Sequence, residues 1–459
     1  MATETTEGIY WLETAPDEPC APLDGDGKAD VVIIGGGFTG LWAAYELKLA
    51  EPGLDVLVLE AATIAHGASG RNGGFAMTLL DMSLAHLLKN YGEERARAAH
   101  EAVAESVDRI GAVCDEHDID CDYHKGGLLE VATNPGQERR IEADLKAAAT
   151  LKLPGFTPLD REALQARVRS PTYRLGFHEE ACAVVHPARL ARGLKRLVMS
   201  QGVRVHEHTP VDWVRPGKGG PVMVRAGEHT VTAEHALMTT NAWARHFPQL
   251  RRKVIPLYTY ILLTEPLSQT QWDEVGWDDR EGIEDKRNYV HYYRRTADGR
   301  ILWGGSDGVI YRSSKIKPQY DRNDKVFALL ESTFRRTFPQ AADVCFSHRW
   351  GGPVAITVPF VPFFGTLSPG NVHYGFGYNG HGVAPSHTGG RILRDLALGR
   401  KTQYTELLFV HASESLFPPQ PILWLGAALT RSLLLRQDRR MDRGQDSGSM
   451  DPWLLRVLR

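Results

Sequence analysis

The sequence has few cysteines and no long apolar run, and each absence excludes a class of protein. Its five cysteines are an odd number spread over 459 residues, which argues against a disulfide framework and favours reduced thiols in a cytoplasm. No stretch approaches the ~18 uninterrupted apolar residues that a membrane-spanning helix needs. The N-terminal segment from Met1 to Glu7 is acidic and has no apolar core, so we expect no secretory signal.

An excess of charge and the common hydrolytic motifs are missing as well. The formal net charge of -3 gives no electrostatic reason to expect nucleic acid or an anionic membrane as a partner. Cys114 and Cys121 have no His or Cys at metal-ligand spacing, so we expect buried thiols and no metal site. No Ser/His/Asp grouping or carboxylate pair indicates hydrolysis.

The most informative stretch is a glycine turn between two expected strands. The apolar run from Val31 to Ile34 is typical of a parallel strand buried on both faces, and it ends at Gly35-x-Gly37-x-x-Gly40. In this spacing the first glycine allows the tight turn, the second lets backbone approach a pyrophosphate, and the third lets the helix pack close to the strand. Glu60 ends the next strand, twenty residues after Gly40, where an acid accepts the hydroxyls of a cofactor ribose. A glycine-rich surface turn is the alternative, but the strands, helix and acid together favour a dinucleotide site.

The length of the chain predicts two domains, and the pattern of elements predicts that they are interleaved. The lead-in covers 1–28, the dinucleotide-binding domain 29–110, 183–253 and 346–404, an antiparallel-sheet domain 111–182 and 254–345, and a helical tail 405–459. In that tail the apolar helix from Pro421 to Arg436 is expected to pack on its own domain or a partner, although the basic residues after it also allow a membrane-surface role.

Three further segments have small or polar residues where a ligand would lie. The loop from Gly67 to Gly74 is almost entirely small residues, and the strand from Leu237 ends in Thr239-Thr240-Asn241. A second glycine turn, from Gly377 to Gly382, precedes a helix from Ser386 to Leu398. Strands whose carboxyl ends are polar often meet a ligand there in open α/β sheets.

The fingerprint and these three segments follow one another in an order that resembles that of the flavin-dependent family that includes glycine oxidase, sarcosine oxidase and D-amino-acid oxidase. The resemblance spans about residues 30 to 400. Within the family the chain is most similar to the gamma-glutamylputrescine oxidase branch, on Tyr10-Trp11, on the segment from Tyr292 to Gly305, and on Phe417 to Pro421. The resemblance implies a mixed α/β fold, in which a Rossmann-like FAD-binding domain is interleaved with a substrate domain whose antiparallel sheet roofs the flavin.

The resemblance also implies FAD as the cofactor, and we expect it to be held without a covalent bond. Val354 to Thr357 contain no cysteine and the loop from Gly67 to Gly74 contains no histidine for attachment, although His66 stands directly before that loop. In that loop, Arg71 and Asn72 would anchor polar groups beside the ring system of the flavin; a flexible loop is the alternative. The second glycine turn would aim N–H groups at the flavin pyrimidine edge. His381 either contributes its side chain or has a structural role. The expected cofactor-binding residues are Gly35, Gly37, Phe38, Thr39, Gly40, Glu60, Ala61, Ser69, Gly70, Arg71, Asn72, Gly73, Gly74, Val211, Asn241, Ala242, Gly377, Tyr378, Asn379, Gly380, His381 and Gly382.

An aromatic cage is expected above the flavin. Hydride transfer from the carbon beside nitrogen requires an uncharged amine, which apolar surroundings favour, and aromatic faces can hold the cation on its way in. The candidates are Tyr258, Tyr260, His291, Tyr292 and Trp303. Tyr258 and Tyr260 share one face of a strand and Thr259 takes the other. For each aromatic residue, ordinary core packing is the alternative.

The sequence therefore predicts a cytoplasmic flavoenzyme that oxidises an amine C–N bond to an imine, which water hydrolyses to an aldehyde or ketone. Its expected partners are a small-molecule amine and oxygen or another electron acceptor. We expect no nucleic acid and no membrane span, and the sequence allows a homo-oligomer. One alternative is an amino-acid oxidase or dehydrogenase of the same family. Another is a flavin-binding structural or electron-relay subunit, and a nicotinamide dehydrogenase is a formal possibility.

Two positions bear on the choice between these functions. Leu302 stands where sarcosine oxidases carry a lysine that assists the oxygen reaction. Val354 stands where glycine oxidase-like members carry an arginine that clamps the substrate carboxylate. We therefore expect an amine substrate, or one whose carboxylate lies far from the reacting nitrogen and reaches Arg294 or solvent.

Overall fold

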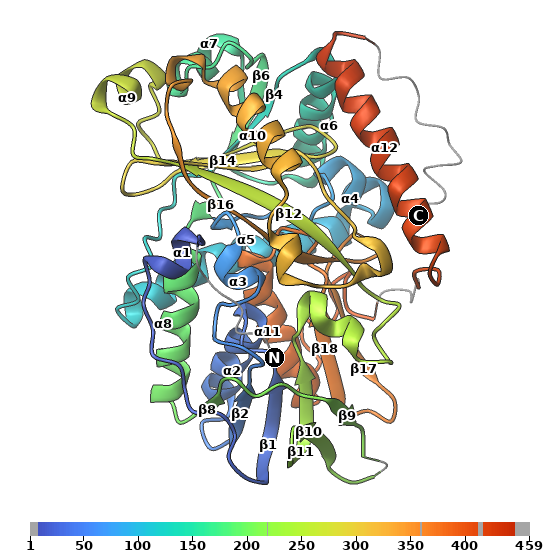
Figure 1. Cartoon of the computed structure of the whole chain (residues 1–459). Coiled ribbons are helices and arrows are strands. Elements are labelled where there is room, and N and C mark those ends of the chain that lie inside the picture. The colour runs from blue at the N-terminus through green and yellow to red at the C-terminus, as the bar shows by residue number, and fades with distance from the viewer. Residues whose placement is uncertain (1–7, 218, 359, 412–415, 446–459) are drawn as a thin grey trace.

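Two large β-sheets organise the chain. The structure, a computed structural model, describes residues 8–445 apart from 218, 359 and 412–415. Within these residues two eight-stranded sheets and one two-stranded sheet are formed. Figure 1 shows the first large sheet below the second, with the helix α12 (Ile422–Asp442) running along one side. The mixed α/β fold expected from the sequence is confirmed.

The first large sheet is mostly parallel and is built from strands far apart in the chain. Its order is β17-β18-β11-β1-β2-β8, with β10 and β9 attached to β11. Residues Val31 to Ile34 of β1 are at most 3% exposed, and alternate residues enter hydrophobic clusters on opposite faces of the sheet. This double burial is why the segment reads as an unbroken apolar run. The strands are β1 (Gly27–Ile34), β2 (Val56–Leu59), β8 (Arg204–His206), β9 (Trp213–Arg215), β10 (Val222–Ala226), β11 (His229–Met238), β17 (Phe363–Leu367) and β18 (Val372–Phe376).

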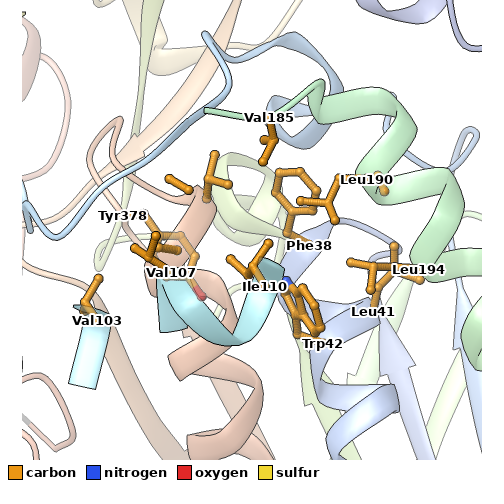
Figure 2. Packing of buried hydrophobic residues seen from close by; sticks show 14 of the residues in the cluster. Phe38, Leu41, Trp42, Val103, Val107, Ile110, Val185, Leu190, Leu194 and Tyr378 are labelled. Atoms are coloured by element: carbon orange, nitrogen blue, oxygen red, sulfur yellow. The ribbon is translucent and has the colours of Figure 1, made fainter. Parts of the chain in front are cut away.

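Helices from four parts of the chain cover one face of this sheet. They are α2 (Phe38–Ala50), α5 (Glu93–Glu116), α8 (Pro187–Ser200) and α11 (Val383–Ala397). Figure 2 shows their shared core, where Trp42 of α2 lies beside Ile110 of α5 and Leu194 of α8. Residues Phe38 to Leu47 of α2, the helix that begins within the glycine fingerprint, are therefore fixed by packing.

A buried ion cluster also joins α2 to α11. Glu46 is 2% exposed and accepts hydrogen bonds from Arg394 Nη1 at 2.6 Å and from Arg391 Nε at 3.3 Å. His387 Nε2 lies 3.4 Å from the same carboxylate. Burial alone would raise the pKa of Glu46, but His387 and the two guanidinium groups together lower it below its ordinary value.

The second large sheet is antiparallel except where β13 runs parallel to β4. Its order is β16-β12-β15-β14-β13-β4-β6-β5. Helix α10 (Asp324–Thr337) packs on the face that points away from the first sheet. Strand β16, which the sequence analysis assigned to the dinucleotide-binding domain, pairs along its length with β12 of this second sheet. The division into domains stays a prediction. The strands are β4 (Leu128–Ala132), β5 (Phe156–Leu159), β6 (Leu175–Glu179), β12 (Ile255–Thr264), β13 (Gly282–Asp285), β14 (His291–Arg295), β15 (Ile301–Gly305) and β16 (Phe346–Ile356).

The C-terminal helix α12 is tied to the rest of the chain by charged groups. Arg431 pairs with Asp307, and Asp442 accepts a hydrogen bond from Arg287 Nη1 at 2.6 Å. Asp438 accepts one from the backbone N–H of Asn288 at 3.0 Å. The rest of the predicted tail, from residue 446, and the acidic segment from Met1 to Glu7 lie outside the described residues. None of the helices within the described part has the length and apolar content of a bilayer-crossing segment.

The remaining elements lie around the two large sheets, and most of them are short. They are α1 (Tyr10–Glu13), α3 (Ala68–Arg71), β3 (Phe75–Ala76), α4 (Leu84–Tyr91), α6 (Pro135–Leu151), α7 (Arg161–Arg167), β7 (Ala183–Val184) and α9 (Gln269–Val275), with 3-10 turns at Asn241–His246, Arg312–Ser314, Pro318–Asp321 and Pro339–Ala341.

Candidate functional site

The glycines of the fingerprint have different surroundings. A Cβ on Gly40 would lie 2.1 Å from the carbonyl oxygen of Gly35, so only glycine lets α2 approach β1 this closely. A Cβ on Gly37 would lie 2.9 Å from Ser69 Oγ, and Gly37 itself lines a cavity. Ser69 Oγ in turn accepts a hydrogen bond from the backbone N–H of Phe38 at 2.9 Å. The turn thus leaves a bare strip of backbone at the N-terminus of α2, where a phosphate group would be stabilised.

Glu60 is held in place by backbone groups on both sides. Its Oε2 accepts a hydrogen bond from the N–H of Gly36 at 2.8 Å and its Oε1 one from the N–H of Ala62 at 2.9 Å. Burial raises the pKa of Glu60, although these two bonds oppose the rise. Since the carboxylate also borders the cavity beside Gly37, its remaining lone pairs can accept hydroxyl groups of a ligand.

A cavity of about 1020 Å³ starts at this turn and runs toward the second glycine turn. We call it the dinucleotide cavity. Two buried polar atoms on its wall, Asn379 Nδ2 and Thr240 Oγ1, have no hydrogen-bond partner among the described residues. Buried polar groups are nearly always satisfied, so these two indicate a ligand with polar atoms. Of the expected cofactor-binding residues, the cavity is lined by Gly35, Gly37, Phe38, Thr39, Glu60, Ala61, Ser69, Asn72, Val211, Asn241, Tyr378, Asn379, Gly380 and Gly382.

The other expected residues lie behind the cavity wall or border a second cavity. A Cβ on Gly70 would lie 2.1 Å from the carbonyl oxygen of Ala65, and one on Gly74 would lie 2.2 Å from that of Val185. These glycines let the chain pack closely and do not line the space. The residues behind the wall are Gly40, Gly70, Gly74, Ala242 and Gly377, and those that border only the second cavity are Arg71, Gly73 and His381.

The small-residue loop from Gly67 to Gly74 is a braced turn that contains helix α3. Asn72 Nδ2 donates to the carbonyl oxygen of Ala68 at 2.9 Å, and Asn72 Oδ1 accepts from the N–H of Gly74 at 2.7 Å. Arg71 pairs with Asp321 and donates from Nε to the carbonyl oxygen of His66 at 2.7 Å. The two side chains that were expected to anchor flavin groups therefore anchor the loop, because their polar atoms already have partners in the protein.

A second cavity, of about 740 Å³, lies between the first cavity and the second sheet. We call it the roof cavity. Its wall shares Asn72, Val354, Asn379 and Gly380 with the dinucleotide cavity, so the two spaces adjoin. The rest of its lining comes mainly from β12, β14, β16 and α12, with further residues from β3, β13 and β15 and from the loops that carry Asp81 and His381, and much of it is apolar. An adjoining pair of this kind suits a long cofactor in one space and a small molecule against its end in the other.

Most of the expected aromatic cage faces away from the roof cavity. Tyr258, Tyr260 and Trp303 lie in the hydrophobic cluster under α10, where Tyr260 packs on Phe327 at a ring distance of 5.6 Å. The sharing of one face by Tyr258 and Tyr260 agrees with the structure, but it is Thr259 that borders the cavity. The assignment of these aromatic residues to the cavity is therefore corrected, because α10 covers their face.

The other two cage candidates differ from each other. His291 is buried beside Asp285, with its Nδ1 3.0 Å from Asp285 Oδ2, and it does not line the roof cavity. Tyr292 does line it, and its ring packs edge-on against Phe75 at 5.8 Å. Of the five residues expected to form the aromatic cage, Tyr292 is thus the one that lines the roof cavity.

Arg294 does not reach the roof cavity, in contrast to its expected role as a partner for a distant carboxylate. It is 0% exposed, and its Nη1 donates to the carbonyl oxygens of Val185 at 2.6 Å and Gly74 at 3.1 Å. Burial lowers the pKa of Arg294 to about 9. Its guanidinium thus joins the backbone at Gly74 to the backbone at Val185, behind the wall of the cavity.

Three titratable groups in the roof cavity were not brought together by the sequence analysis. His381 Nδ1 lies 3.1 Å from Asp81 Oδ1, and His381 Nε2 lies 3.6 Å from Glu284 Oε2. Burial alone would lower the pKa of His381, but the two carboxylates raise it to about 10, so the imidazole is a cation at neutral pH. No local pattern links these residues, because they lie in three segments about 80, 280 and 380 residues from the N-terminus.

The comparisons with known proteins agree with this geometry. A family described as FAD dependent oxidoreductase matches residues 30–396. The chain is 33% identical over 399 residues to the gamma-glutamylputrescine oxidoreductase of Escherichia coli, covering 86% of this chain and 90% of that protein. It is 31% identical over 402 residues to the probable oxidoreductase OrdL of Haemophilus influenzae, covering 86% and 89%. Among solved structures, glycine oxidase from Geobacillus kaustophilus superimposes with a TM-score of 0.71 at 18% identity, covering 85% of this chain and 98% of the other.

Proposed function

Because the chain belongs to the family of FAD dependent oxidoreductases, we propose that it oxidises the C–N bond of a primary or secondary amine that carries no carboxylate next to the reacting carbon. The product is an imine, which water hydrolyses to an aldehyde or ketone. FAD as the cofactor and an enzymatic function follow from the family match. The choice of an amine over an amino acid is the proposal.

The observation that carries this choice is the charge of the roof cavity. Among the described residues that line this cavity, the one arginine is Arg71, and its guanidinium is already paired with Asp321. Val354 borders the space at the position where the resemblance to glycine oxidase places an arginine that clamps the substrate carboxylate. A carboxylate left unpaired in such a cavity would cost several kcal/mol in lost hydration. The cavity therefore favours substrates without an α-carboxylate.

The lining of the roof cavity also suits the chemistry of an amine. When bound, FAD accepts a hydride from the carbon next to nitrogen. The nitrogen must be uncharged for this, and the apolar walls provided by Ile261, Trp350 and Leu423 disfavour its protonated form. Leu423 belongs to α12, so this helix helps to exclude water from the reacting groups.

Anaerobic reduction of the flavin by a panel of amines tests the proposal. We expect 1-aminopentane and N-methylbutylamine to reduce the flavin at least about tenfold faster per unit concentration than glycine, sarcosine or D-alanine, a difference of about 1.4 kcal/mol. The measurement is loss of flavin absorbance in a stopped-flow spectrometer. If the simple α-amino acids win by the same margin, another group binds the carboxylate and the proposal is wrong. If no amine or amino acid bleaches the flavin even when diamines are added to the panel, the proposed oxidation of a C–N bond is wrong.

The mode of flavin attachment has a separate expected result. We expect acid precipitation of the purified protein to release all the yellow colour into the supernatant, because Val354 to Thr357 offer no cysteine. His66 borders the dinucleotide cavity directly before the small-residue loop, so it is a histidine that could attach the flavin. Colour that stays in the pellet of the wild type but not in that of His66→Ala would show a covalent bond at this residue.

A further inference from the structure

One carboxylate in the roof cavity lacks a hydrogen-bond donor. Glu284 is 3% exposed and borders the cavity from β13. Among the described residues no group donates a hydrogen bond to it, and its ion-pair partner, His381 Nε2, lies 3.6 Å away, beyond ordinary hydrogen-bond length. Buried carboxylates are normally paired and hydrogen-bonded. The side chain therefore faces the cavity with unused acceptor capacity.

The neighbouring cations are already paired with other acids. Lys286, two residues along the chain, pairs with Glu130 and with Asp144 at 2.8 Å. Arg431 of α12 pairs with Asp307. The two carboxylates of Asp81 and Glu284 thus share a single cation, the His381 imidazolium. Although burial raises the pKa of Asp81, the cluster has one negative charge in excess when both carboxylates are ionised. In a cavity with much apolar lining, such a charge attracts a cation strongly.

The reacting amine is a poor occupant for this position. Its nitrogen has to lose a proton before the hydride leaves, and a nearby carboxylate stabilises the protonated form. A cation that keeps its charge throughout the reaction suits the position better. The group bound here is therefore distinct from the one that reacts.

We propose that Glu284, with Asp81 beside it, binds a second and permanently protonated ammonium group of the substrate, so that the preferred substrates are aliphatic diamines or amines with a distal cationic group. His381 holds the two carboxylates in place between the second glycine turn and β13. This inference rests on the proposed function for its substrate class. The subsite itself can be tested by binding alone.

The test compares two ligands of similar length that differ in one charge. Under anaerobic conditions, the Kd values of 1,4-diaminobutane and 4-aminobutan-1-ol are measured by titration calorimetry on the FAD-loaded protein whose flavin has first been reduced with dithionite, so that the ligands bind but cannot react. We expect the wild type to prefer the diamine by about tenfold or more, as a buried charge pair would give. In Glu284→Gln, which keeps the size and removes the charge, the preference is expected to fall to about twofold or less.

Matched variants separate a specific subsite from a general effect. Glu274→Gln removes an exposed acid of α9, away from the cavity, and should keep the full preference. Asp81→Asn should lower it, and this variant replaces Glu284→Gln if the latter fails to retain FAD. Equal affinity for both ligands in the wild type, or an undiminished preference in both Glu284→Gln and Asp81→Asn, overturns the subsite.

The outcomes also distinguish the subsite from the proposed function. If the diamine binds selectively but no amine reduces the flavin, the function is wrong and the subsite holds. If monoamines and diamines bind and react alike, the function holds and the subsite is wrong.

Discussion

Replacing Gly37 by valine is expected to give a folded but colourless protein, with less than about a tenth of the wild-type flavin content. The new Cβ would lie 2.9 Å from Ser69 Oγ, and the two methyl groups would occupy the space at the N-terminus of α2. Gly37 has a φ of -78°, which valine also adopts, so the backbone can keep its course. The loss should therefore be one of cofactor and not of fold.

The control is a glycine of the same strand-helix-strand unit. Gly53 lies in the turn after α2, and a Cβ added there would meet no atom within 4 Å, so Gly53→Val should stay yellow. Flavin content is measured from the absorbance ratio of the purified proteins, and circular dichroism checks that both are folded. Wild-type flavin content in a folded Gly37→Val would show that the pyrophosphate lies elsewhere.

Replacing Glu46 by glutamine is expected to lower the free energy of unfolding by about 3 kcal/mol. The change removes the carboxylate to which Arg391, Arg394 and His387 are drawn. The value lies at the lower end for a broken buried ion pair, because Arg391 keeps a bond to Glu105 and Arg394 keeps one to Asp395. With FAD in excess, the midpoint of thermal unfolding should fall by about 3 °C.

A surface ion pair offers the matched comparison, and pH offers a second one. Glu51 is half exposed in its pair with Arg400, so Glu51→Gln should cost less than about 1 kcal/mol. Because the pKa of Glu46 is lowered in the folded protein, its contribution is complete above the ordinary glutamate pKa of about 4.3 and is lost as the pH falls through the native value. The Glu46→Gln deficit should thus be constant from neutral pH to about pH 5.5 and shrink in stronger acid. A deficit that grows on acidification would contradict this account.

The strand, turn and helix of the fingerprint and the identity of the cofactor could be predicted from the sequence because their signals are local. The run ending at Ile34, the spacing from Gly35 to Gly40 and the acid at Glu60 lie within one strand-helix-strand unit. Each has a direct geometric meaning, such as the Cβ on Gly40 that would meet Gly35. Local signals of this kind do not depend on how distant parts of the chain pack.

The roof cavity could not be read in the same way. Alternation along β12 placed Tyr258 and Tyr260 together, but only the position of α10 decides which face of the strand is covered. The phenylalanines in or just after α10, Phe327, Phe334 and Phe338, could have indicated that the aromatic face of β12 packs under this helix. The approach of Asp81, Glu284 and α12 to one space depends on long-range packing, for which a single sequence carries no signal.

The strand order of the first sheet has a consequence for how the protein is made. β1 lies between β2 and β11, and β11 lies between β1 and β18, so the sheet is incomplete until the chain has been synthesised past Phe376. Contacts of such large sequence separation form late and slowly. The walls of the dinucleotide cavity include Gly35 and Asn379, which are more than 300 residues apart in the chain. Capture of the flavin is therefore a late step of biosynthesis, although the fingerprint that starts the site leaves the ribosome early.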